Sequence, residues 1–244
     1  MWYDEECTEG QRRDICQTFR LCSRIVVLSE EWRDFLLNRR ICDIEQVKVL
    51  HNAVNIPGEN VTDYTSNTVL FMGRLDERKS PNVLLRAAAR TLPAHPDARF
   101  VFGGDGDVRA YEKLADELGI YDKCRFIGWA AGEKKDEAFQ NCSIFCLPSK
   151  NEGMPMSVLE AMSYGLATIA TPVGGVPQII NDGVDGFLFP VDDVTALTEK
   201  LDVLMSDNAL KERIGKCGRA CIEKSFSLDA YMDQIDTIYE IIRK

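Results

Sequence analysis

The chain has 244 residues, 45% of them hydrophobic and 28% charged, and its 29 basic and 39 acidic side chains give a formal net charge of −10. This composition argues against wholesale disorder, and the acidic balance argues against a nucleic-acid partner, because backbone phosphates need a clustered positive field. No apolar run approaches the roughly 18 residues of a membrane helix, and the acidic first residues lack a secretory signal. We therefore expect a cytoplasmic protein, and peripheral attachment to the inner face of a membrane stays open.

The first 67 residues alternate helices and strands before a polar stretch. The predicted elements are a helix at 9–22, a strand at 24–28, a helix at 29–38 and a strand at 46–50. Residues 56–67 contain Pro57 and Gly58 and have no periodicity, which indicates a linker. Two strands and two helices are too few to close a core. We therefore expect residues 1–55 to be the trailing part of a Rossmann-like domain whose beginning is absent.

From residue 68 the chain alternates continuous apolar runs with amphipathic helices. Strands are predicted at 68–72, 99–102, 124–127, 143–147 and 167–170, with a weaker one at 186–189. Helices are predicted from Pro81, whose neighbour Ser80 is expected to cap the helix with its side chain, and at 108–118, 133–140, 155–164 and 175–180. This alternation predicts an α/β fold, a doubly wound parallel sheet of the Rossmann-like type with one complete domain and a partial second one. Ligands bind such sheets beyond the carboxyl ends of the strands.

The tail from residue 191 is predicted to be helical throughout. Its last helix, opening at 227 and ending at Lys244, repeats apolar residues at three- and four-residue steps, so that one face needs a partner surface. We expect residues 68–226 to form the complete domain and residues 227–244 to pack back on the N-terminal part.

Nine cysteines are an odd count without a Cys-x-x-Cys pair, which fits reduced thiols better than a disulfide framework. Cys142 with Cys146 and Cys217 with Cys221 could share helix faces, but no histidine lies near them in sequence to complete a zinc shell. Buried small hydrophobic residues are the better interpretation.

The turn after the first strand of the large sheet carries two cations, Arg74 and Lys79. It leaves the carboxyl end of a strand, where Arg74 and Lys79 could converge on a diphosphate. The alternative is a solvated turn whose charges pair with Asp76 and Glu77, at about 0–1 kcal/mol per pair.

Residues 103–107, Gly-Gly-Asp-Gly-Asp, superficially resemble a dinucleotide-binding fingerprint. Arg109 occupies the place of its third glycine, and no acidic ribose ligand ends the next strand. A tight turn that needs the freedom of glycine explains the segment better.

The most informative stretch runs from residue 147 to 162. A strand ends at Leu147, a loop carries Glu152 and Gly153, and Pro155 begins a helix. The free N–H groups of Gly153, Met154 and the first turn can donate to sugar hydroxyls or phosphate oxygens. Glu160, among apolar neighbours, suits recognition of a vicinal diol such as that of ribose. The alternative places Glu160 on a wet face and leaves Glu152 to the helix dipole.

Together these residues resemble the family-four retaining glycosyltransferases, enzymes of two Rossmann-like domains that face a cleft. The resemblance covers residues 68–242 strongly, and residues 20–56 resemble the end of the N-terminal domain. It rests on Gly73-Arg74-Leu75 with Lys79, on Phe126-Ile127-Gly128, on Pro148-Ser149, on Glu152 and Glu160 separated by seven residues, and on the Thr-Pro-Val-Gly-Gly-Val-Pro turn at 171–177.

The resemblance implies a retaining hexosyltransferase of polysaccharide biosynthesis that moves a sugar from a nucleoside-diphosphate donor to a glycan or lipid-linked acceptor. By this likeness, the catalytic residues are Arg74, Lys79 and Glu152, and Glu160 binds ribose. No metal and no cofactor is expected, because protein cations offset the diphosphate charge. Donor contacts are implied for Gly73, Arg74, Lys79, Phe126, Ile127, Gly128, Glu152, Gly153, Met154, Pro155 and Glu160.

Two substitutions and the length depart from the family. Ser80 replaces a glycine after the lysine, and Gln178 replaces a glutamate, so that any charge role there is lost. Most of the acceptor half is missing, so the chain can be too truncated to act alone and is expected to rely on that half or on a second chain. A non-catalytic nucleotide-sugar-binding or assembly module that lacks its acceptor half, and a sugar-nucleotide epimerase, stay open as alternatives.

Overall fold

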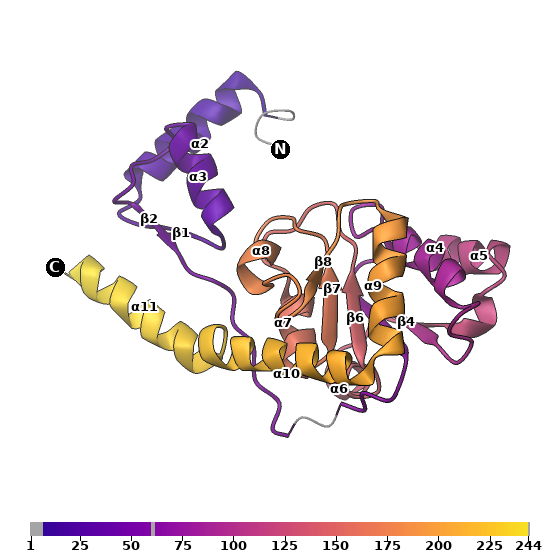
Figure 1. The fold of residues 1–244 in the computed structure, drawn as a ribbon. Coiled ribbons are helices and arrows are strands. Elements are labelled where there is room, and N and C mark those ends of the chain that lie inside the picture. Colours follow the sequence, from indigo (N-terminus) through magenta and orange to yellow (C-terminus); the bar gives the residue numbers. More distant parts are fainter. Residues whose placement is uncertain (1–6, 60–61, 244) are drawn as a thin grey trace.

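A single parallel sheet organises most of the chain in the computed structural model, which describes residues 7–59 and 62–243 (Figure 1). Its strand order is β5-β4-β3-β6-β7-β8, and every neighbouring pair is parallel. The strands are β3 (Thr68–Met72), β4 (Arg99–Gly103), β5 (Cys124–Gly128), β6 (Ile144–Leu147), β7 (Ala167–Ala170) and β8 (Phe187–Leu188). The predicted doubly wound α/β fold is confirmed. The order reverses between β3 and β6, where such sheets open a crevice for ligands.

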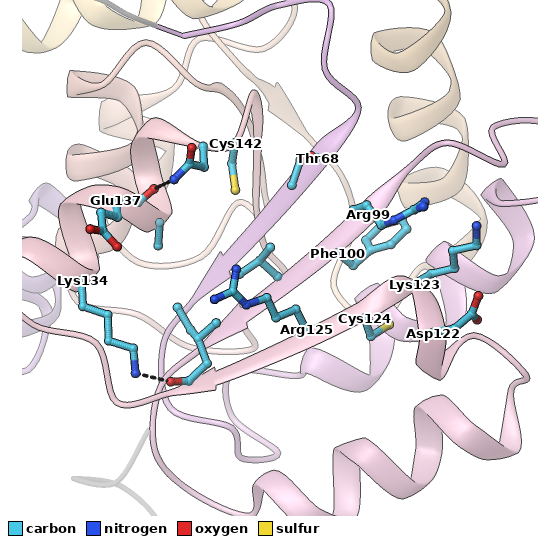
Figure 2. A pocket seen from close by; sticks show the side chains of 14 residues that line it. Thr68, Arg99, Phe100, Asp122, Lys123, Cys124, Arg125, Lys134, Glu137 and Cys142 are labelled. Atoms are coloured by element: carbon cyan, nitrogen blue, oxygen red, sulfur yellow. Dashed lines mark hydrogen bonds between the residues drawn. The ribbon is translucent and has the colours of Figure 1, made fainter.

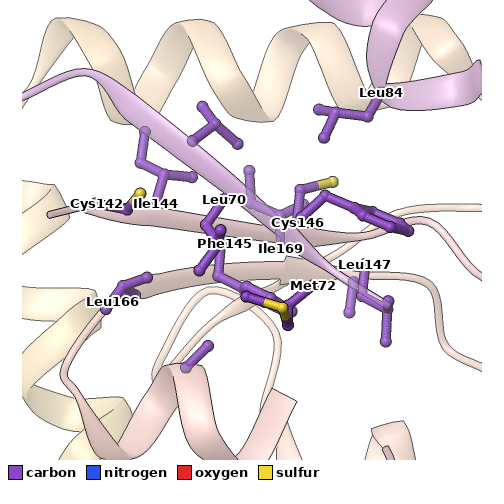
Figure 3. Packing of buried hydrophobic residues seen from close by; sticks show 14 of the residues in the cluster. Leu70, Met72, Leu84, Cys142, Ile144, Phe145, Cys146, Leu147, Leu166 and Ile169 are labelled. Carbon is purple, nitrogen blue, oxygen red and sulfur yellow. The ribbon is translucent and has the colours of Figure 1, made fainter. Parts of the chain in front are cut away.

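Helices cover the sheet because its strands are apolar on both faces. They are α4 (Pro81–Thr91), α5 (Val108–Glu117), the short 3-10 helix η1 (Tyr121–Lys123), α6 (Glu133–Gln140), α7 (Met156–Ser163), α8 (Val176–Ile179), α9 (Val194–Ser206) and α10 (Asn208–Ser225). Figure 3 shows Leu84 of α4 above the strands and Leu166, which follows α7, below them. Side chains of β6 such as Phe145 and Cys146 are fully buried between these layers.

The cysteines of this core behave as small apolar residues. Burial raises the pKa of the Cys142 thiol to about 12 and raises that of Cys146 further. All nine cysteines are free thiols. Across residues 7–59 and 62–243, no group of three or more metal-ligating side chains gathers.

Ser80 is the N-cap residue of α4, followed by Pro81, as predicted, but the expected capping bond of its side chain is absent. Its backbone is left-handed, with φ 50° and ψ 47°. Its Oγ instead donates to the carbonyl of Glu77 at 2.9 Å. The left-handed conformation turns the hydroxyl away from the helix start, and it also gives the physical reason why glycine suits this position.

The N-terminal elements form a smaller unit with its own core. They are α2 (Glu9–Leu21), β1 (Ile25–Val27), α3 (Glu30–Asn38) and β2 (Val47–Val49), in which β1 and β2 pair in parallel. Phe35, Leu36 and Ile41 are buried in a cluster separate from that of the large sheet. The predicted elements of this segment are confirmed.

The last helix, α11 (Leu228–Arg243), runs from the end of α10 away from the six-stranded sheet (Figure 1). Met232 and Tyr239 on it are 52% and 59% exposed. Its packing against the N-terminal part stays a prediction. The acidic first six residues, residues 60–61 of the expected linker and Lys244 lie outside the described residues. None of the described helices has the length and hydropathy to cross a bilayer.

Candidate functional site

Loops at the carboxyl ends of β3 and β4 and the start of α7 surround one cavity of about 380 Å³. We call it the rim cavity; its walls include Gly73, Arg74, Lys79, Lys135, Ser157 and Glu160. Four of the residues predicted for the site, Gly73, Arg74, Lys79 and Glu160, therefore share one hollow, although they are up to 87 positions apart (160 − 73).

The turn that carries Arg74 rests on the glycine-rich loop after β4. The Leu75 N–H donates to the Asp105 carbonyl at 2.6 Å, and the Asp107 N–H donates to the Leu75 carbonyl at 3.0 Å. Gly104 has φ +144°, and a Cβ there would lie 1.9 Å from the carbonyl oxygen of Gly73. The loop is the tight turn that the sequence predicted, and its glycines let it hold the Arg74 turn in place.

The guanidinium of Arg74 is only weakly paired with other charged groups of the protein. Its side chain is 61% exposed, and its Nε lies 3.8 Å from Asp76 Oδ2. An exposed pair at this distance contributes about 0–1 kcal/mol. Asp76 instead accepts a hydrogen bond from the Lys79 backbone N–H at 2.9 Å. The guanidinium at the cavity wall is thus available to an incoming anion.

Glu152 is a nearly buried carboxylate that lies beside two cationic side chains. Its side chain is 6% exposed, and Lys79 Nζ lies 2.6 Å from its Oε1. Arg78 NH1 lies 3.7 Å from its Oε2. A carboxylate buried this deeply needs such partners to stay charged. Lys79 joins Glu152 to the rim cavity, and Arg78 is a partner that the sequence did not single out.

A second glycine turn supports the Glu152 loop. Gly174 has φ +58°, and a Cβ on it would lie 1.9 Å from the Glu152 carbonyl oxygen. The Gly175 N–H donates to the Gly153 carbonyl at 2.6 Å. The Gly-Gly part of the motif at 171–177 thus fixes the backbone beside Glu152.

Glu152 does not itself line the rim cavity; it lines a cavity of about 610 Å³, with Glu31 and Trp32 of α3 on its wall. Met154 is buried, and its carbonyl accepts from Asn52 Nδ2 at 3.0 Å. Pro155 is the N-cap residue of α7. None of Gly153, Met154 and Pro155 lines the rim cavity.

Glu160 is partly buried and paired, so it does not lie on a freely solvated face. Its side chain is 21% exposed, and Lys135 Nζ of α6 lies 2.5 Å from its Oε1. Helical spacing puts Glu160 on the same side of α7 as Met156 and Ser157, while Val158 and Leu159 face the core. Lys135 was missed because no sequence signal links a lysine on one helix to a glutamate on the next.

Phe126, Ile127 and Gly128 are not in the wall of the rim cavity. The Phe126 ring stacks on Phe102 with centroids 5.0 Å apart, and the Gly128 carbonyl accepts from the Gly104 N–H at 2.8 Å. The residues that follow them, from Trp129 to Gly132, do line the cavity.

Ile127 instead lines another cavity of about 320 Å³, between β5 and α6. Figure 2 shows Arg99, Arg125 and Lys134 around it, and Lys134 Nζ donates to the Ile127 carbonyl at 2.6 Å. This cavity begins at the amino ends of the strands, since Thr68 and Arg99 line it.

Gln178, which replaces a glutamate of the family pattern, joins the two parts of the chain. Its Oε1 lies 2.9 Å from His51 Nε2. The position thus keeps a polar contact with the N-terminal part without a charge of its own.

Comparisons with known proteins place the chain in a family and show what its fold is similar to. Residues 55–220 match the family model described as glycosyl transferases group 1. An uncharacterized glycosyltransferase of Methanocaldococcus jannaschii, MJ1607, is 25% identical over 98% of this chain and 65% of its own length. A D-inositol 3-phosphate glycosyltransferase of Corynebacterium kroppenstedtii is 29% identical over 82% of this chain and 52% of its own. The chain thus spans about half to two thirds of these relatives.

Among solved structures, Anabaena HepE in complex with UDP superposes with a TM-score of 0.86 at 19% identity, covering 97% of this chain and 69% of that one. This likeness shows the fold. With the family model matched over most of the large sheet and its helices, the chain belongs to the group 1 glycosyl transferases.

Proposed function

We propose that this chain binds the nucleotide-sugar donor of a glycosyltransferase that moves a hexose to a glycan or lipid-linked acceptor with retention of configuration. The observation that carries the proposal is the gathering of Arg74, Lys79 and Glu160 in the rim cavity, with Glu152 bonded to Lys79. Two cations beside two carboxylates match a ligand that has a diphosphate between two polyhydroxylated rings.

Arg74 and Lys79 would bind the diphosphate. The ammonium of Lys79 has three N–H donors, so it can keep Glu152 and still donate to a phosphate oxygen. Charge-assisted hydrogen bonds of this kind contribute about 1.5–3 kcal/mol each. They strengthen as negative charge develops on the leaving group, which is the condition for catalysis by electrostatic stabilisation.

Glu160 would accept hydrogen bonds from the ribose hydroxyls, and Glu152 would hold the transferred sugar. Both are carboxylates already fixed by a lysine, so little reorganisation is needed when a hydroxyl arrives. Gly153 and Met154 belong to the same loop as Glu152, and Phe126, Ile127 and Gly128 precede the Trp129–Gly132 segment of the wall, where the base would lie.

In the proposed reaction the bond between the sugar C1 and the diphosphate oxygen breaks, and the acceptor oxygen bonds to C1 on the same face. The acceptor hydroxyl proton passes to the departing phosphate oxygen. The products are a glycoside and a nucleoside diphosphate. The developing oxocarbenium ion lies near the Glu152 carboxylate, whose charge favours it.

Calorimetric titration with UDP and with GDP tests the proposal. We expect one of them to bind at sub-millimolar concentration, and Arg74→Ala and Glu160→Ala each to weaken that binding about tenfold or more, the loss of one charge-assisted bond. Lys113→Ala is a matched control, because Lys113 pairs with Glu117 on the exposed face of α5. The proposal fails if neither nucleotide binds at millimolar concentration, or if both site variants bind as the control does. Slow hydrolysis of a nucleotide sugar would separate an enzyme from a non-catalytic binding module.

A further inference from the structure

Lys135 lies in the rim cavity but belongs to none of the motifs that the family resemblance uses. Its Nζ lies 2.5 Å from Glu160 Oε1, and the side chains of Lys135 and Glu160 are 30% and 21% exposed. This partial burial distinguishes the pair from the more exposed ion pairs of the protein, such as Lys216 with Glu212, whose side chains are 62% and 47% exposed. A pair removed from water is less screened and holds its geometry better.

The pair stands between two cavities. Both residues line the rim cavity, and both also line a cavity of about 260 Å³ on the side of Asn55 and Leu228. The Glu160 carboxylate therefore has open space on two sides. Without a fixed partner it could turn toward either side.

The helix that carries Lys135 is held firmly against the helix that carries Glu160. Tyr164, at the end of α7, donates its hydroxyl proton to Asp136 Oδ1 at 2.7 Å and stacks on Phe139 with centroids 5.2 Å apart. Asp136 is the acid adjacent to Lys135, and Tyr164 occupies one of its oxygens. These contacts join α6 to α7 and leave Glu160 as the carboxylate that Lys135 contacts.

We propose that Lys135 is a positioning residue for nucleotide recognition: it holds Oε1 of Glu160 so that the carboxylate faces the rim cavity and accepts from the ribose hydroxyls. It also offsets the charge of Glu160, which would otherwise repel the diphosphate bound by Arg74 and Lys79. This inference rests on the proposed function.

The test compares UDP with 2′-deoxy-UDP, because the deoxy nucleotide lacks one of the two ribose hydroxyls from which Glu160 is proposed to accept, and the difference isolates that one hydrogen bond. Dissociation constants of both nucleotides are measured by calorimetry for the wild type, Lys135→Met, Lys135→Arg and Lys216→Met. The wild type is expected to prefer UDP by about tenfold, the effect of one hydrogen bond to a charged group. In Lys135→Met this preference should fall below about threefold, whereas Lys135→Arg and the control Lys216→Met should keep most of it.

An undiminished preference for UDP in Lys135→Met would overturn the inference, and so would a wild type that binds both nucleotides equally. Tighter binding of UDP by Lys135→Met would also overturn it, because Lys135 would then compete with the ribose for Glu160. Should Lys135→Met fail to fold, Lys135→Gln takes its place. If the titration of the proposed function finds GDP as the ligand, GDP and 2′-deoxy-GDP replace the uridine pair. Failure of the proposed function is distinguishable, because the wild type would then bind neither UDP nor GDP.

Discussion

Lys211 is a fully buried ammonium whose partners are neutral. Its Nζ donates to the Ser66 carbonyl at 2.8 Å, to Asn67 Oδ1 at 2.7 Å and to Asn208 Oδ1 at 3.3 Å, and the residue has no exposed surface. Burial lowers the pKa of Lys211 from 10.5 to about 8, although the more distant Asp97 and Asp63 act in the opposite direction. The bonds to Ser66 and Asn67 tie α10 to the residues that lead into β3, and the bond to Asn208 lies within α10.

This burial makes the contribution of Lys211 to stability depend on pH. Between pH 8 and 10.5 the unfolded chain binds more protons at this lysine than the folded chain, so its contribution to the free energy of unfolding rises with pH. We predict that the unfolding free energy of the wild type minus that of Lys211→Met increases across this range, as measured by urea denaturation. A difference that stays flat from pH 7 to 10.5 would show that Lys211 is not desolvated.

The negative charge of Glu152 should act in sugar transfer more than in nucleotide binding. Glu152→Gln keeps the shape of the side chain and an oxygen for Lys79 but removes the negative charge. We predict that nucleotide-sugar hydrolysis or transfer falls about 100-fold, the scale of one electrostatic contact to the transition state, while UDP affinity changes by less than about threefold. The measurement is a kcat comparison with UDP binding on the same preparations. Equal losses in both would assign Glu152 to nucleotide binding instead of sugar transfer.

At the scale of the element, two glycine turns act as supports for charged loops. Gly174 meets the Glu152 carbonyl, and Gly104 meets the Gly73 carbonyl, in both cases at a distance that admits no side chain. The positions of the charged loops therefore depend on the glycine turns that pack against them.

Gly174→Ala should separate this packing effect from simple backbone strain. Gly183 is the matched control, because it also has positive φ, +76°, but nothing lies within 4 Å of its Cβ position. A residue other than glycine in this conformation costs about 1–2 kcal/mol. We predict that Gly183→Ala loses about this amount with unchanged UDP binding. Gly174→Ala should lose more, because the Glu152 loop must move, and should also impair donor hydrolysis. Equal effects of the two substitutions in thermal unfolding and hydrolysis assays would refute this role.

The elements themselves were accessible from sequence. Apolar runs such as that at 68–72 have one physical explanation, a strand covered on both faces, and β3 spans the same residues. Contacts through space were not accessible. The left-handed Ser80 and the support from Gly104 depend on which loop lies opposite. The pairing of Lys135 with Glu160 depends on how α6 and α7 pack. The resemblance singled out Arg74, Lys79, Glu152 and Glu160, but neither Lys135 and Arg78, which pair with the two carboxylates, nor the glycine turns that support the loops.

At the scale of the whole molecule, polar contacts tie the segment at 51–58, which follows the smaller unit, to the large domain. Asn52 bonds to Met154, His51 bonds to Gln178, and the Val54 N–H donates to the Phe226 carbonyl at 2.9 Å. Arg219 of α10 donates to the carbonyls of Pro57 and Gly58, both at 2.7 Å. Of these contacts, those of Asn52 and His51 reach Met154 and Gln178, close to the Glu152 loop and to the cavity lined by Glu31 and Trp32.

Three buried cysteine thiols should lower the stability of the protein at alkaline pH. Burial raises the pKa of Cys124 and of Cys142 to about 12, and that of Cys146 further, from an ordinary value of 9.0. Above pH 9 the unfolded chain loses these protons first, so it binds fewer protons than the folded chain and stability falls. Three thiols outweigh the opposite contribution of Lys211. We predict that the free energy of unfolding, measured with urea under reducing conditions, declines from pH 9 to 11. This decline should be smaller in Cys142→Ala. A stability that rises over this range would contradict the prediction.

The most direct measurement is a crystal structure of this chain with UDP bound. We predict that the diphosphate lies between Arg74 and Lys79, that the ribose hydroxyls donate to Glu160, and that Lys135 still contacts the same carboxylate. UDP bound instead in the cavity between β5 and α6, beside Arg125 and Lys134, would contradict it.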